Sequence, residues 1–129
     1  MGEDIYQRLA DRFARLAALG DAAAVLHWDM ATMMPPGGAE ARGRQLAELN
    51  AVQHGILTDP ETEAWLDEAE AEGPWAIANL AEMRRRWTHA TALDEALVKA
   101  LTTTAAACET AWRGARADND FAAVLPHLD

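Results

Sequence analysis

The stretch Leu26-His27-Trp28-Asp29-Met30-Ala31-Thr32-Met33-Met34-Pro35-Pro36-Gly37-Gly38-Ala39-Glu40-Ala41-Arg42 decides the fold. A helical pattern of large side chains ends here, and two prolines and two glycines follow. Proline lacks a backbone donor and pushes the residue before it out of the α region. We therefore expect a helix to stop at about residues 32–34. A second helix should start within a few residues, because Pro-Pro-Gly-Gly is too short to be a domain linker.

The apolar residues upstream of this turn recur at three- and four-residue steps, which is the spacing of one helix face. They are Ile5, Leu9, Phe13, Leu16, Ala23 and Leu26. The pattern predicts a helix from about residue 3 to residue 31. Gly20 lies inside it, but a lone glycine costs only about 1 kcal/mol relative to alanine. One long helix, with any bend at Gly20, is therefore expected.

Two further helices are predicted directly after the turn. The first covers residues 38–57, and its inward residues are Leu46, Leu49, Val52 and Ile56. The second covers residues 60–72, because Thr58-Asp59-Pro60-Glu61 combines a capping residue, a proline in the first turn and an acid near the positive end of the helix dipole. Its apolar content is Trp65 and Leu66, and Gly73 is expected to end it.

The remaining helices are predicted at residues 74–90 and from about residue 94 to 117. The first of these starts at Pro74, ends at Thr88 or Ala90, and has four inward residues, Ile77, Leu80, Met83 and Trp87. Thr91 or Asp94 should cap the second. Its apolar residues form a stripe that we expect to face inward, composed of Leu93, Leu97, Leu101, Ala105, Cys108 and Trp112.

Composition sets the class of protein. A chain of 129 residues is expected to form one domain, residues 1–129, and its alanine-rich apolar half without alternating segments predicts an all-α fold. The predicted architecture is five or six helices in an antiparallel array.

The net charge of −10 disfavours nucleic acid and anionic membranes as partners. A single cysteine, no signal-peptide pattern and no apolar run of about 20 residues make the cytoplasm the expected location.

Residues suited to catalysis or metal binding do not form a complete site in this sequence. No two of the four histidines are one helical turn apart, so a His-Glu-x-x-His zinc helix cannot form. A site assembled from distant histidines remains the alternative. Cys108 is expected to be a buried structural thiol, and Arg84-Arg85-Arg86 a solvated or ion-paired turn rather than a phosphate site. The acids between Glu61 and Glu72 are expected to form a solvated face rather than a catalytic carboxylate pair.

The polar residues of the opening stretch have two interpretations. His27 is either a helix-end histidine satisfied by a neighbouring group or part of a site. Asp29 is either a hydrogen-bond acceptor that pairs with an arginine such as Arg42, or a catalytic acid. We favour the structural interpretation, in which Trp28 and Met34 pack at the turn and Asp29 and Arg42 connect the two helices.

The end of the sequence resembles the start of an unfinished element. After the turn at residues 117–120, Pro126 occupies a position where helices begin, and three residues follow it. A helix needs many more residues to be stable in water. We therefore expect this chain to be a truncated part of a larger fold.

Two motifs together resemble the N-terminal region of the carboxypeptidase Taq family of metallocarboxypeptidases. The first is the run from Trp28 to Arg42, and the second extends from Trp112 to Leu128. Residues that carry the resemblance are Trp28, Asp29, Thr32, Met34, Pro35, Pro36, Arg42, Trp112, Arg116, Phe121 and Pro126. The resemblance covers the chain in register, and we interpret these residues as a structural motif with no catalytic or metal-binding role.

The resemblance implies a larger helical enzyme that removes C-terminal residues from peptides. In the full-length family, zinc or cobalt is held by a His-Glu-x-x-His helix and a later glutamate, whereas no cofactor is expected in this chain. The chain would then be a wall or lid of the substrate cleft, inactive alone. Its expected partners are the missing catalytic part or a second copy in a homodimer, and peptide substrate only in the full-length enzyme. The alternative is a free-standing helical interaction or dimerisation module derived from that family.

Overall fold

The computed structural model describes residues 4–128, and helices account for nearly all of them. The order is α1 (Ile5–Thr32), a 3-10 turn η1 (Pro36–Gly38), α2 (Ala39–Leu57), α3 (Pro60–Glu68), α4 (Gly73–Thr91), α5 (Glu95–Asp118), η2 (Phe121–Ala123) and η3 (Leu125–His127). The described part of the chain contains no strand. The prediction of an all-α fold with five main helices is confirmed.

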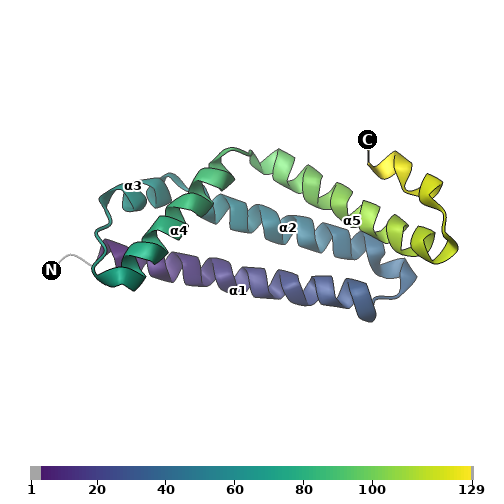
Figure 1. The fold of residues 1–129 in the computed structure, drawn as a ribbon, viewed down its shortest axis with the longest axis horizontal. Coiled ribbons are helices and arrows are strands. Elements are labelled where there is room, and N and C mark those ends of the chain that lie inside the picture. Colours follow the sequence, from purple (N-terminus) through teal and green to yellow (C-terminus); the bar gives the residue numbers. More distant parts are fainter. Residues whose placement is uncertain (1–3, 129) are drawn as a thin grey trace.

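The helices form an elongated array in which α2 lies between α1 and α5 (Figure 1). Helix α1 runs uninterrupted through Gly20, as expected. The chain reverses at η1, and α2 returns antiparallel to α1. Helices α3 and α4 cover the end of the array that contains the start of α1, and α5 then runs back along α2 to the opposite end (Figure 1). The opening stretch and the last turns of the chain therefore occupy the same end of the molecule.

Large apolar side chains form the core at the α3–α4 end. The first half of α1 packs there against the end of α2, against α3 and against α4. The buried members are Leu9, Phe13, Leu16, Leu57, Leu66, Ala69, Leu80 and Met83. Three of the six residues predicted to be inward in α1 are buried here and Ile5 packs against them, because the three- and four-residue spacing places them on one face of a regular helix.

Small residues characterise the contact between α2 and α5. A Cβ added at Gly43 would lie 3.6 Å from the Cβ of Ala106, which is ordinary van der Waals contact. Leu46 is the large residue of this cluster, and it packs with Ala23, Met30 and Ala106. A polar contact lies beside these small residues: the Asn50 amide donates to the Thr102 hydroxyl at 3.0 Å.

A further polar contact joins the same two helices. The ammonium group of Lys99 in α5 lies 3.3 Å from a carboxylate oxygen of Glu48 in α2. This hydrogen bond raises the pKa of Lys99, and the nearby Glu95 adds to the shift. Glu48 is exposed and Lys99 is half-buried, so solvent screens the pair and it orients α5 on α2 more than it stabilises the contact.

The arginine run Arg84-Arg85-Arg86 points in three directions, as helical geometry requires. Arg84 donates from Nη2 to the carbonyl oxygen of Leu66 at 2.6 Å, and thereby satisfies a carbonyl at the end of α3. Arg85 pairs with Glu82 at 2.6 Å, and this hydrogen bond lowers the pKa of Glu82. Arg86 lies over the Phe13 ring, 5.2 Å from its centroid. The run was predicted to be a solvated or ion-paired turn, and Arg85 is the member that forms an ion pair.

Three details of the predicted helices were wrong. Helix α3 ends at Glu68, not at residue 72, because Ala69 adopts an extended conformation (φ −65°, ψ 128°) and is buried in the core. Val52 and Ile77, predicted to be inward, are exposed. The buried residues of α2 are Gly43, Leu46, Ala47, Ala51 and Leu57, and those of α4 are Leu80 and Met83. Val52 and Ile77 therefore lie off the packed faces of their helices.

The apolar stripe of α5 faces outward, contrary to the prediction. Helix α5 packs on α2 through residues such as Ala106, whereas its large side chains lie on the opposite face. The exposed members of the predicted stripe are Leu93, Leu97, Leu101, Ala105 and Trp112, and Cys108 is only partly buried. The expectation of a fully buried thiol at Cys108 was therefore also wrong.

Candidate functional site

The turn between α1 and α2 is held by an ion pair that the sequence suggested. Asp29 Oδ2 accepts from Arg42 Nη2 at 2.5 Å and from Nε at 3.1 Å. Both side chains are about three-quarters buried, so solvent screens the pair only partly. Two guanidinium nitrogens that donate to one carboxylate oxygen restrict the orientation of the arginine side chain as well as its distance from the aspartate. It therefore fixes the first turn of α2 against the last turn of α1.

Backbone contacts complete this turn. The amide groups of Met33 and Met34 both donate to the carbonyl oxygen of Asp29, at 3.0 and 2.9 Å. The Thr32 hydroxyl donates to the Trp28 carbonyl at 2.7 Å. Pro35 precedes η1 and Pro36 opens it. A Cβ at Gly38 would lie 3.0 Å from Cγ of Met34, so a larger residue there would require the Met34 side chain to shift by a few tenths of an ångström.

The packing role expected for Trp28 is not seen among the described residues. Its side chain is 60% exposed, whereas Met30 is buried and Met34 is half-buried against the cluster around Leu46. Trp28 lies on the outer side of α1, because α2 approaches α1 from the side that carries Met30. The apolar contact at the turn is therefore made by Met30 and Met34.

The second motif forms a compact cap on the end of α5. Asn119 ends the helix in the left-handed region at φ 57°, a conformation that asparagine tolerates better than most residues. The carboxylate of Asp120 accepts from the amide of Ala123 at 3.2 Å. Arg116 lies 5.2 Å from the centroid of the Trp112 ring. Phe121 is exposed, and Pro126 lies in the first turn of η3.

A residue that the sequence reasoning missed, Arg113, connects the two motifs. Its Nη1 donates to the carbonyl oxygen of Met30, and its Nη2 pairs with Glu109. The Met30 carbonyl is one of the last four of α1, which have no partner within the helix. Arg113 thus satisfies the end of α1 from α5. Nothing in the local sequence indicates this role, because the contact depends on how α5 lies across the turn.

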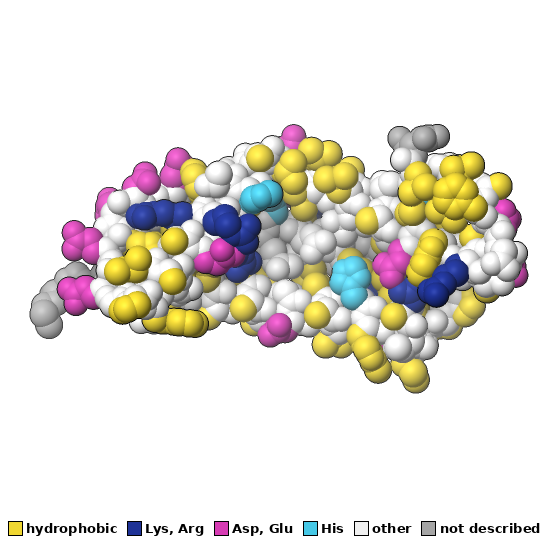
Figure 2. All heavy atoms as spheres, in the orientation of Figure 1, with side chains coloured by type: hydrophobic (Ala, Val, Ile, Leu, Met, Phe, Trp, Pro, Cys, Tyr) yellow, Lys and Arg dark blue, Asp and Glu magenta, His cyan; other side chains and the backbone are white. Residues whose placement is uncertain are grey.

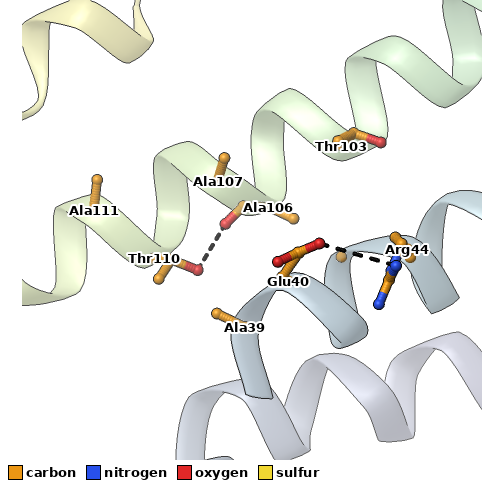
Figure 3. Close-up of a pocket in the computed structure, with 9 residues that line it drawn as sticks. Ala39, Glu40, Arg44, Thr103, Ala106, Ala107, Thr110 and Ala111 are labelled. Carbon is orange, nitrogen blue, oxygen red and sulfur yellow. Dashed lines mark hydrogen bonds and ion pairs between the residues drawn. The ribbon is translucent and has the colours of Figure 1, made fainter. Parts of the chain in front are cut away.

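An apolar groove lies between the start of α2 and the middle of α5 (Figure 3). Its volume is about 560 Å³, and its lining consists mainly of small side chains, Ala39, Gly43, Thr103, Ala106, Ala107, Thr110 and Ala111. Glu40 and Arg44 border it and lie 3.9 Å apart. The Thr110 hydroxyl donates to the Ala106 carbonyl. The lining contains no histidine or cysteine and alanine is its most frequent residue, so the groove suits an apolar side chain rather than a chemical step.

The titratable residues that the structure describes do not gather into a metal-binding group. Nowhere in residues 4–128 do His, Cys, Asp and Glu side chains gather in a group of three that could hold a metal ion. His27 and His89 are exposed, and His54 is half-buried. The acids of α3 are exposed, as predicted for a solvated face. None of the helices in the described part of the chain has both the length and the apolar character needed to cross a membrane.

The ion pair at the turn leads to a prediction about stability. Replacement of Arg42 by alanine should lower the free energy of unfolding by about 1–1.5 kcal/mol, since it leaves Asp29 partly buried without its partner. Arg44→Ala is the matched control on the same helix, because Arg44 is exposed and its ion pair is long. It should cost less than about 0.5 kcal/mol. Urea denaturation measures both. Equal effects of the two substitutions would show that the Asp29–Arg42 pair does not hold the turn.

The helical architecture matches part of a solved metallocarboxypeptidase. The solved structure of metallocarboxypeptidase 1 of Trypanosoma cruzi superposes with a TM-score of 0.73 at 36% identity, over 96% of this chain and 26% of that one. The BsuCP crystal structure superposes with a TM-score of 0.89 at 21% identity, over 98% of this chain and 26% of that one.

Sequence comparison identifies the family. Residues 8–129 match the family described as Carboxypeptidase Taq (M32) metallopeptidase, and the chain belongs to this family. Thermostable carboxypeptidase 1 of Thermus thermophilus is 33% identical over 132 aligned positions, which cover 98% of this chain and 26% of the relative. The chain thus spans about a quarter of the length of these relatives, and it matches their N-terminal part.

Proposed function

We propose that residues 1–129 act as the N-terminal helical part of a metal-dependent carboxypeptidase that removes C-terminal residues from peptides in the cytoplasm. In this role the helices form a wall or lid of the substrate cleft. The observation that supports the proposal is the match to the family over residues 8–129, together with a coverage of only 26% of a relative that is a carboxypeptidase. The catalytic residues would then come from the other three quarters.

The donor set in this chain does not fit the metal that such an enzyme uses. The sequence contains no His-Glu-x-x-His motif, and the described residues bring together no group of three donors. Asp29, the best-placed carboxylate of the motifs, is already engaged by Arg42. The proposed contribution of this chain is therefore the shape of the cleft, and no step of the metal chemistry is assigned to its residues.

Activity measurements test the proposal directly. The free chain, supplied with zinc or cobalt, should release no C-terminal amino acids from a peptide. A chimera in which residues 1–129 replace the aligned quarter of Thermus thermophilus carboxypeptidase 1 should release them. Mass spectrometry of the peptide follows the trimming. Steady trimming by the free chain, or a folded chimera without activity, would contradict the proposal.

A free-standing interaction module is the second candidate, and the exposed apolar face of α5 favours it. Such a module would cover this face with a second copy or with another protein. The reading frame downstream of the codon for Asp129 separates the candidates. A His-Glu-x-x-His sequence encoded in frame supports the carboxypeptidase, whereas an immediate stop codon supports the module.

A further inference from the structure

We infer that the outer face of α5, continued by η2 and η3, is the surface on which the catalytic three quarters of the enzyme dock. We call this surface the α5 face, and its large residues are Leu93, Leu97, Leu101, Trp112, Phe121, Leu125 and Leu128. The inference rests on the proposed function and deepens it, because it names which side of the helical array contacts the remainder. It commits to that remainder as the occupant, rather than to a second copy.

The exposure of the large residues is the first support. Leu101 is 53% exposed at the centre of the face, although α5 has small residues available and uses them against α2. Figure 2 shows hydrophobic side chains gathered over α5 and again over the C-terminal turns. Exposed apolar patches of this extent mark interaction surfaces in soluble proteins.

The absence of charge on the middle of α5 is the second support. From Ala100 to Cys108 the helix carries no charged side chain, although charged residues make up 25% of the chain. A helix face that remains in water normally carries charged residues. Depletion of charge is instead typical of the centre of a protein interface.

The opposite end of the array has the reverse character. The acids of α3 and of the segment after it are all exposed, namely Glu61, Glu63, Asp67, Glu68, Glu70 and Glu72. Figure 2 shows acidic side chains gathered at that end. The molecule thus has an acidic end that suits solvent and, on the middle of α5, an uncharged stretch that suits an apolar partner.

A hollow on the α5 face has the size of a side-chain pocket. Its volume is about 270 Å³, and it lies between Trp112, Arg116, Phe121 and Val124. Among its lining residues Val124 is buried, Trp112 and Phe121 are exposed, and Asn119 and Asp120 add polar groups. Aromatic walls around a small pocket are typical of the places where interface anchors insert.

The length of the relatives points to the remainder as the occupant. The family match includes η2 and η3, which are the turns of the α5 face. In the relative from Thermus thermophilus the aligned part is only 26% of the chain, so about three quarters of that protein lies outside the match. A covalently connected segment is present at high effective concentration at this face. It therefore outcompetes a second copy for the same apolar surface.

Labelling of Cys108 tests the inference with a readout other than activity. Cys108 lies on α5 and is partly exposed. Its alkylation by iodoacetamide, followed on the Cys108 peptide by mass spectrometry, should be at least about tenfold slower in the chimera than in the free chain, because docking shields the thiol. Leu101→Glu should abolish this protection and lower the melting temperature of the chimera.

Ile77→Glu is the matched control, because Ile77 is an aliphatic residue of α4 that is 57% exposed, close to the value for Leu101. It should leave both the labelling rate and the melting temperature of the chimera unchanged. Neither substitution should alter the unfolding of the free chain. If the chimera does not fold, the same two substitutions at the aligned positions of the intact Thermus thermophilus enzyme decide the question through its melting temperature.

Three results would overturn the inference. The first is equal labelling of Cys108 in the folded chimera and the free chain, and the second is equal effects of the Leu101→Glu and Ile77→Glu substitutions. The third is a labelling rate of the free chain that falls as the concentration of that chain is raised, which would indicate a second copy on the α5 face. A chimera with a shielded Cys108 but no activity would refute the proposed function alone. An active chimera with an unshielded Cys108 would refute the docking face alone.

Discussion

Replacement of Leu46 by alanine should lower the free energy of unfolding by about 2–5 kcal/mol, since the substitution removes buried methyl groups and leaves a cavity. Leu46 is 0% exposed and is the large side chain of the cluster that joins α1, α2 and α5. Its neighbours Ala23 and Ala106 are too small to fill the space. Urea denaturation followed by circular dichroism measures the loss. Folded domains are stable by only about 5–15 kcal/mol, so this effect is a large fraction of the total.

Leu101→Ala in α5 is the matched control for this prediction. It makes the same chemical change at a side chain that is 53% exposed, so the free chain should lose less than about 0.5 kcal/mol. If Leu101→Ala destabilises the free chain as much as Leu46→Ala, then the α5 face is covered in that state. Such a result would contradict the observed orientation of α5.

The contrast between Leu46 and Leu101 shows how far the sequence predicts the fold. Both residues belong to apolar patterns with helical spacing, and the pattern correctly predicts that each lies on an apolar face. Periodicity does not show what covers that face, because a core and an interface require the same spacing. The orientation of α5 depends on Ala106 and Gly43, which allow the close approach to α2, and small residues give no strong signal of burial.

The contacts of the candidate site that join residues close in sequence could be predicted, and those that join distant residues could not. The Asp29–Arg42 pair could be predicted, because a Pro-Pro-Gly-Gly turn brings the end of one helix close to the start of the next. The Arg113 contact with the Met30 carbonyl could not, because it joins residues that are 83 positions apart. The exposure of Trp28 also depends on the side from which α2 approaches α1. Long-range geometry of this kind leaves no trace in local spacing.

Replacement of Thr62 by valine should destabilise the chain by about 2 kcal/mol, because it leaves buried polar groups without partners. Thr62 is fully buried, and its hydroxyl accepts from Arg12 Nη1 at 2.6 Å and donates to the Ile56 carbonyl at 3.1 Å. That carbonyl is among the last four of α2, which lack partners within the helix. One hydroxyl on α3 therefore joins α1 to the end of α2.

The shape of valine matches that of threonine, so the loss measures the hydroxyl rather than a cavity. Thr62→Ser is the complementary control, because it keeps the hydroxyl and removes one methyl group, at a cost of about 1 kcal/mol. Arg12 would retain its contacts with Glu61 and with the Trp65 ring in either variant. Thermal unfolding should therefore rank the wild type above Thr62→Ser and Thr62→Val lowest. The reverse order of the two variants would mean that α3 is held by apolar packing, and that the link through Arg12 contributes little.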